Sequence, residues 1–196
     1  MVFDLLLPAL VLVAMAGVSL AVRRKGPASF GFHRPARPAR LVAAMLAFAM
    51  AWTLLHLVLF APIANHLSGT EQDTSGFADL EGDLAMLLLL IVLSWTLAAL
   101  VEETAFRGYL LTRITGLLGP GRGPVLAAVL LSSLLFGLIH TEQGAVGVTL
   151  AAVDGVAFCV LRLCTGTLWA AVLAHGFMNS IGFVAFYLAG PIDGLW

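Results

Sequence analysis

The sequence predicts an all-α, polytopic membrane protein with about six transmembrane helices in one bundle around an intramembrane polar cavity. Of its 196 residues, 61% are hydrophobic and 11% are charged, whereas a soluble domain has about 25% charged residues. The mean hydropathy is +1.02. Apolar runs of roughly 20 residues, long enough to cross a bilayer as helices, recur along the chain.

The first two predicted spans are residues 2–22 and 41–63. Between them lies a basic, proline-broken loop, residues 23–40, which the positive-inside rule places in the cytoplasm. Because this positive charge follows the first apolar run, we expect a retained anchor with an outer N-terminus and not a cleaved signal peptide. His56 lies inside the second span and is expected to be a packed or water-bonded residue, not a ligand.

The third predicted helix, residues 84–111, is too long for a hydrocarbon core of about 30 Å unless it tilts or projects. Residues 112–123 contain four glycines and one proline, which predicts a turn-rich connection. Pro124 then opens the fourth helix, a favourable position for proline. We expect this helix to run to Glu142 and to carry His140.

The fifth and sixth predicted spans are residues 144–163 and 166–188. The fifth is rich in glycine and alanine, which permits close approach of neighbouring helices. It also contains Asp154, which we expect to pair with Arg162 or a histidine, or to line the cavity wall. No internal repeat or linker is found, so the chain is predicted to form one domain.

Three ionisable residues stand together at the end of the third apolar run: Glu102, Glu103 and Arg107. Each such residue in a membrane segment costs at least about 2.5–3.5 kcal/mol and usually has a function. On a helix, Glu103 and Arg107 are at i and i+4, which favours an ion pair. Glu102 is rotated by about 100° from Glu103 and is free to face a cavity. The alternative is that these charges mark the point where the helix leaves the lipid.

Two more polar pairs follow on apolar helices. Phe136 and His140 share one face of the fourth helix, and His175 and Asn179 share one face of the sixth, each at i and i+4. Polar groups in a membrane protein face its interior or a wet cavity, so we expect them to meet Glu102 at a common site. The alternative for each histidine is a hydrogen bond between helices, contributing about 1 kcal/mol.

The three motifs together resemble a known family. They are Glu102-Glu103-x-x-x-Arg107, Phe136-x-x-x-His140 and His175-x-x-x-Asn179. This order is similar to the three-motif pattern of the CAAX prenyl protease and bacteriocin-processing (CPBP/Abi) family of intramembrane endopeptidases, which includes the type II CAAX prenyl endopeptidases. The resemblance implies that residues 84–188 are a catalytic four-helix core within a single membrane domain, residues 1–196, and that residues 2–63 are two variable N-terminal spans.

The resemblance implies a peptide hydrolase in which Glu102 and His140 activate the attacking water, while His175 and Asn179 stabilise the oxyanion. It assigns supporting positions to Glu103, Arg107 and Phe136. The chemistry agrees with these roles. An apolar cavity raises the pKa of a carboxyl group, which makes it a usable general base near neutral pH. One preorganised oxyanion donor contributes about 10²–10³ in rate.

We expect no cofactor, but a zinc-dependent peptidase is an alternative. Glu102, His140 and His175 would form a His₂Glu zinc set with one open position, although no His-Glu-x-x-His helix is present. A non-catalytic bacteriocin-immunity or scaffold protein is a second alternative. A proton-coupled transporter is a third, although it would usually show inverted repeats.

Two other protease types are disfavoured by the sequence. Ser132 and Ser133 are close to His140 along the chain, but nothing marks either as an activated nucleophile. An aspartyl protease would need two facing membrane aspartates, and Asp154 alone lies deep in a predicted span.

The expected partners are the lipid bilayer and a membrane-associated peptide or protein, such as a prenylated tail, a bacteriocin or a leader peptide. Nucleic acid is excluded because the basic loop is short and lacks interleaved aromatic residues. We expect a multi-pass protein of the cell membrane, specifically a bacterial inner membrane.

One expectation conflicts with a shared site. Measured from the predicted helix midpoints, Glu102 lies about four residues, roughly 6 Å, toward the cytoplasmic side, and His140 about six residues, roughly 9 Å, toward the outer side. The two can meet only if the fourth helix sits lower, or the third higher, than hydropathy indicates.

Overall fold

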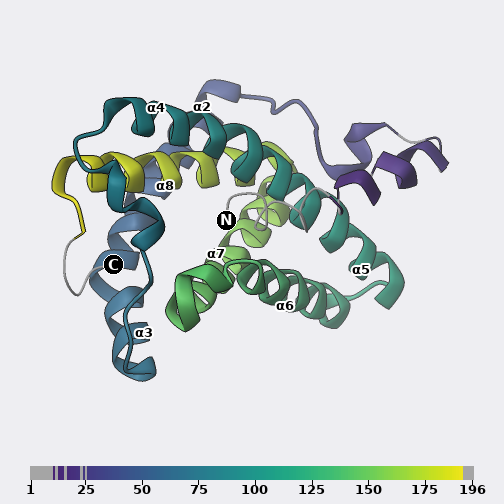
Figure 1. Ribbon diagram of the computed structural model, residues 1–196. Coiled ribbons are helices and arrows are strands. Elements are labelled where there is room, and N and C mark those ends of the chain that lie inside the picture. Colours follow the sequence, from purple (N-terminus) through teal and green to yellow (C-terminus); the bar gives the residue numbers. More distant parts are fainter. Residues whose placement is uncertain (1–10, 12, 16, 23, 25, 192–196) are drawn as a thin grey trace.

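The computed structural model describes residues 11, 13–15, 17–22, 24 and 26–191. Every regular element in this part of the chain is a helix (Figure 1). Four of the described helices are long and apolar enough to cross a membrane: Pro38–Ser68, Leu84–Leu118, Thr141–Thr165 and Leu168–Ala189. The chain is therefore an all-helical, multi-pass membrane protein. The predicted first span lies mostly outside the described residues, and the total of about six spans stays a prediction.

The helix Pro38–Ser68 contains the predicted second span. It consists of α2 (Pro38–Leu55), a π-helical segment (His56–Phe60) and α3 (Ala61–Ser68). Pro38 opens it, in the first turn, where the missing N–H has no helical partner to lose. Gly69 ends it with a φ of 69°, the left-handed conformation that glycine adopts most readily.

The helix that carries the acidic motif is 35 residues long, from Leu84 to Leu118. In order, it consists of α4 (Leu84–Leu93), two π-helical segments (Ser94–Glu102 and Thr104–Leu110) and α5 (Leu111–Leu118). Local π-helical winding is rare and occurs often at functional sites.

The prediction that the chain turns from residue 112 onward is wrong, because residues 112–118 continue the helix as α5. A single glycine within a helix, such as Gly116, lowers its stability by only about 1 kcal/mol relative to alanine. The break comes at Gly119-Pro120-Gly121, where Gly119 has a φ of 91° and Gly121 a φ of 128°.

The prediction that the fourth helix extends to Glu142 is also wrong. Helix α6 (Arg122–Leu138) ends before His140, which lies in the turn that leads to a short 3₁₀ segment (Thr141–Gln143). The His140 ring nitrogen Nδ1 lies 2.8 Å from the carbonyl oxygen of Phe136. His140 thus satisfies one of the carbonyl groups that a helix C-terminus leaves without a partner.

The last two long helices, α7 (Gly144–Thr165) and α8 (Leu168–Ala189), match the predicted fifth and sixth spans closely. Helix α8 is the centre of the bundle, in contact with α2, α4 and α7 (Figure 1). Helices α6 and α7 pack closely because a glycine lies at their contact: a Cβ atom on Gly137 would lie 2.5 Å from the carbonyl oxygen of Val148. Small residues let helices approach in this way in membranes.

The distribution of polarity is the reverse of that in a soluble domain. Large apolar side chains such as Leu88, Leu130 and Val160 are exposed on the outer faces of the helices. The buried polar residues are Ser94, Glu102, Glu103, Arg107, Ser132, Ser133, Thr167 and His175. This arrangement suits a lipid environment, in which charged groups must face the protein interior.

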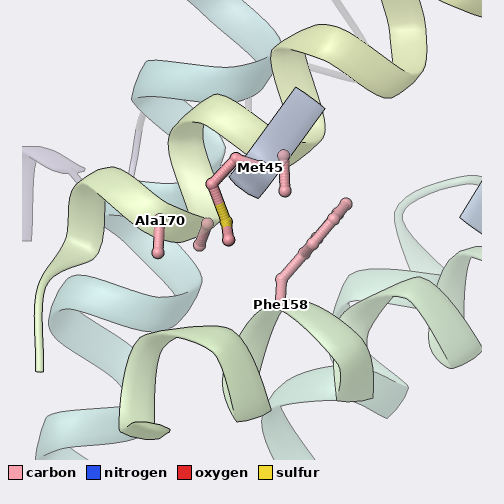
Figure 2. Close-up of a cluster of buried hydrophobic side chains, with 5 residues drawn as sticks. Met45, Phe158 and Ala170 are labelled. Carbon is pink, nitrogen blue, oxygen red and sulfur yellow. The ribbon is translucent and has the colours of Figure 1, made fainter. Parts of the chain in front are cut away.

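A hydrophobic cluster supports the buried polar groups. It combines Met45 of α2, Phe158 of α7 and three alanines of α8, among them Ala170. Figure 2 shows the labelled Met45, Phe158 and Ala170 side chains meeting from three helices. The Phe158 ring also stacks on the His175 ring, with centroids 5.0 Å apart and an interplanar angle of 15°. The core therefore restrains the orientation of this histidine.

Candidate active site

Five of the predicted site residues line a cavity of about 290 Å³: Glu102, Phe136, His140, His175 and Asn179. A neighbouring cavity of about 170 Å³ shares Glu102, His140 and Asn179 with the first. The residues shared by both cavities come from the π-helical segment Ser94–Glu102, the turn after α6, and α8. Three separate parts of the chain therefore place polar groups where the two cavities meet.

The expected difference in depth between Glu102 and His140 does not keep them apart, since both line the same two cavities. The predicted midpoint of the helix that carries Glu102 was misplaced, because this helix runs from Leu84 to Leu118 and does not end at residue 111. Midway between residues 84 and 118 is residue 101, next to Glu102. His140, for its part, has left the helix and lies in a turn.

Glu102 is buried, with 5% of its surface exposed. Its carboxylate makes no hydrogen bond to any described residue, and the oxygen Oε2 is fully enclosed. A buried carboxylate without hydrogen-bond donors is costly. The position of Glu102 on the cavity wall therefore favours a water molecule or a ligand group as its partner.

His140 presents one ring nitrogen for chemistry. Its Nδ1 lies 2.8 Å from the Phe136 carbonyl oxygen, which can only accept a hydrogen bond. Nδ1 therefore carries the proton and donates, and in the neutral ring the lone pair is on Nε2. Since His140 lines both cavities together with Glu102, a carboxyl group and a ring nitrogen that can accept a hydrogen bond flank one space.

Glu103 and Arg107 form a fully buried ion pair, as their spacing predicted. Arg107 Nη1 donates to Glu103 Oε1 at 2.9 Å, and both side chains are 0% exposed. The Arg107 guanidinium carbon also lies 4.1 Å from the centroid of the Phe136 ring, a distance at which a cation is attracted to the ring face. Neither charged residue is part of the lining of the two cavities.

Glu103 has a second partner that sequence reasoning missed. His175 Nδ1 lies 2.9 Å from the same oxygen, Glu103 Oε1. Because a carboxylate accepts and does not donate, His175 Nδ1 carries a proton, and its Nε2 is the nitrogen left for the cavity. The two residues are 72 positions apart, so no short spacing pattern could reveal the contact.

Asn179 lines both cavities, on the same helix as His175. Its side chain makes no hydrogen bond within the described part of the chain. An amide group carries two donors. Asn179 can therefore donate to an oxygen atom placed where the two cavities join.

The serines considered in the sequence have other partners. The Ser132 hydroxyl donates to the Phe106 carbonyl oxygen at 3.2 Å, and Ser133 lies against Cys159 Sγ at 4.0 Å. Neither serine lines either cavity. The geometry thus gives no support to a serine nucleophile.

Asp154 pairs with a histidine, one of the expected alternatives. Its Oδ1 accepts a hydrogen bond from the Trp52 indole at 2.7 Å and lies 2.8 Å from His56 Nε2. Arg162, the other candidate partner, instead donates to the Phe30 carbonyl oxygen at 3.5 Å. Both His56 and Asp154 line the larger cavity, a position that sequence reasoning had not given to His56.

The alternative zinc set finds no support in the arrangement of the donors. Within the described residues, no group of three His, Cys, Asp or Glu side chains is placed to hold a metal ion. Glu102, His140 and His175 line one cavity but are not gathered as ligands.

The comparison with protein families agrees with the motifs. A family model described as type II CAAX prenyl endopeptidase Rce1-like matches residues 84–181, half of the chain, and this range contains all three motifs. No curated protein and no solved structure matches the chain. The multi-pass helical architecture and the family match lead to one conclusion: the chain belongs to the type II CAAX prenyl endopeptidase Rce1-like family of membrane endopeptidases.

Proposed function

We propose that this protein is an intramembrane endopeptidase that hydrolyses a peptide bond with a water molecule activated by Glu102 and His140. One observation carries the proposal: the enclosed Glu102 carboxylate has no partner among the described residues, and it lies where two cavities meet beside His140. The family supports a peptidase in general terms, and the residue roles are inferred from these contacts.

The first step is attack by water on the peptide carbonyl. Glu102 accepts a proton from a water that also donates to His140 Nε2, and the oxygen attacks the carbonyl carbon. Charge then develops on the carbonyl oxygen, which needs preorganised donors. The Asn179 amide is one such donor. A His175 ring protonated on both nitrogens is the other, since Nε2–H can donate while Nδ1–H stays on Glu103.

The second step is collapse of the tetrahedral intermediate. Glu102 returns the proton to the leaving amine, as a general base must when it acts as the acid in the reverse direction. Glu103 and Arg107 do not touch the reacting atoms in this scheme. Glu103 holds His175 through Nδ1 at 2.9 Å and supplies a negative charge beside it, and Arg107 balances that charge at 2.9 Å.

We place the reaction within a cell membrane, with a bacterial inner membrane as the proposed location and the basic loop of residues 23–40 on the cytoplasmic side. The proposed substrates are membrane-associated peptides, namely prenylated tails, bacteriocins or leader peptides. No metal is needed for these steps, and a zinc ion held by Glu102, His140 and His175 is the alternative to be tested.

The test is cleavage of a membrane-tethered peptide library by purified protein treated with chelator. We compare the wild type with Glu102→Gln and with a matched control, Glu71→Gln, in an exposed loop outside both cavities. Cleavage by the wild type and control, lost in Glu102→Gln, would support the proposal. Loss in all three, with recovery in zinc for the wild type, would move Glu102 to the role of a metal ligand. Equal cleavage by all three would exclude Glu102 as the base.

A further inference from the structure

A second polar cluster lies on the wall of the larger cavity, away from the catalytic motifs in sequence. It consists of Asp154 of α7 and His56, the first residue of the π-helical segment His56–Phe60, with Trp52 of α2 behind them. Asp154 and His56 line the cavity that Glu102 also lines, whereas Trp52 does not. The side chain of Asp154 is 20% exposed and that of His56 is 16% exposed, so both are accessible from the cavity.

The contacts of Asp154 all converge on one oxygen atom. Oδ1 accepts from the Trp52 indole at 2.7 Å and lies 2.8 Å from His56 Nε2. The indole N–H can only donate, so this carboxyl oxygen acts as an acceptor. The second oxygen, Oδ2, makes no hydrogen bond within the described part of the chain. A carboxyl group with one free oxygen thus remains at the cavity wall.

A contact that only links α2 to α7 would not require a carboxyl group at position 154. A neutral acceptor such as an asparagine carbonyl would also accept from the Trp52 indole. An ionisable side chain within a membrane span is costly and usually marks a functional site. The π-helical winding at His56 is a second feature often found at such sites.

The two cavities differ in character on either side of the catalytic residues. The larger one carries polar side chains of Gln72 and Thr74 in addition to His56 and Asp154. The smaller one is lined by leucines of the helix Leu84–Leu118, including Leu90 and Leu93, and by Glu142 near the catalytic residues; Gln143 lines both cavities. A peptide whose scissile bond lies at Glu102 would extend past Asp154 on one side and past the leucines on the other.

We infer that Asp154 and His56 form a subsite that binds a cationic group of the substrate peptide, on the side of the scissile bond away from the leucine-lined cavity. The cation is a lysine or arginine side chain or a free N-terminal ammonium group. This inference rests on the proposed function, because it assumes that the larger cavity receives a peptide. It extends that function by naming a chemical preference of the substrate.

The test measures binding and not cleavage, so that it remains decisive if catalysis fails. Full-length Glu102→Gln protein in lipid nanodiscs is titrated with acetylated peptides in which one lysine is moved along an otherwise neutral sequence. The matched peptides carry norleucine in place of lysine. A further peptide has a free N-terminus and no lysine, which separates the two sources of the cation.

We expect the lysine peptide to bind about ten- to hundredfold more tightly than its norleucine partner at one position of the scan, the range for a charged hydrogen bond. If the N-terminal ammonium is the natural cation, the free N-terminal peptide gains this affinity instead. Adding Asp154→Asn should abolish the preference, since asparagine keeps the acceptor for Trp52 but loses the charge.

The control is Trp52→Phe, which removes a donor to Asp154 and keeps the carboxylate. This variant should retain the preference for the cation, whatever its effect on stability. Equal binding of all peptides, or a preference that Trp52→Phe abolishes while Asp154→Asn preserves it, would overturn the inference. Failure of the wild type to cleave any peptide, with the binding preference intact, would instead count against the proposed function alone.

Discussion

Replacing Glu103 with glutamine tests how the buried ion pair contributes to the site. Glu103 Oε1 holds both Arg107 and His175, each at 2.9 Å. Glutamine preserves the size of the side chain and one acceptor oxygen but removes the negative charge. Arg107, which is 0% exposed, is then left as an uncompensated buried cation.

The expected loss of stability follows from this burial. Breaking a buried ion pair by removing one partner costs about 3–5 kcal/mol, which lowers the unfolding midpoint of a chain of this size by about 10 °C. The second variant is Glu103→Gln with Arg107→Met, in which neither charge remains. Its unfolding midpoint should return close to that of the wild type, because an apolar side chain can replace a buried charged pair at little cost.

Cleavage should behave differently from stability. In the double variant His175 still lacks its negative neighbour, so the peptide cleavage rate should stay about a hundredfold below the wild type, the effect of one oxyanion donor. Thermal unfolding in detergent and initial cleavage rates below the midpoint measure the two quantities separately. Recovery of the cleavage rate together with the midpoint would refute the argument, because Glu103 would then act only on stability.

Three further predictions concern residues around the site. Asn179→Ala should lower the maximal cleavage rate by about 10²–10³ with an unchanged unfolding midpoint, and a loss below tenfold would remove Asn179 from the oxyanion site. Ser132→Ala removes only a hydrogen bond to the Phe106 carbonyl oxygen, so cleavage rates should stay within about twofold; inactivity of a folded variant would revive a serine mechanism. Gly137→Ala places a Cβ atom 2.5 Å from the Val148 carbonyl oxygen, so the thermal midpoint should fall, and an unchanged midpoint would show that α6 and α7 can separate without cost.

Composition was sufficient to predict the helical membrane architecture. Apolar length located α7 and α8 to within a few residues, since glycine and proline mark their ends. It failed at residues 112–118, where scattered glycine and polar residues suggested a turn but the helix continues to Leu118. It also failed at His140, whose side chain bonds to the carbonyl of Phe136 after the helix has ended. Hydropathy does not register such local caps.

Spacing within one helix predicted the Glu103–Arg107 pair, because i and i+4 residues are neighbours on any α-helical surface. Spacing along one helix cannot predict contacts between different helices. The hydrogen bond from His175 to Glu103 joins residues 72 positions apart, and that from Trp52 to Asp154 joins residues 102 apart. The relative depth of Glu102 and His140 depended on where each helix truly ends, which hydropathy alone places poorly.

The central claim is that the Glu102 carboxylate activates the water that cleaves the peptide. Its most direct test is the single-turnover cleavage rate of Glu102→Gln relative to the wild type, on one cleaved peptide, in chelator and at equal folded concentration. Loss of a general base predicts a fall of about 10²–10⁴, with peptide binding preserved. A rate within tenfold of the wild type would contradict the account.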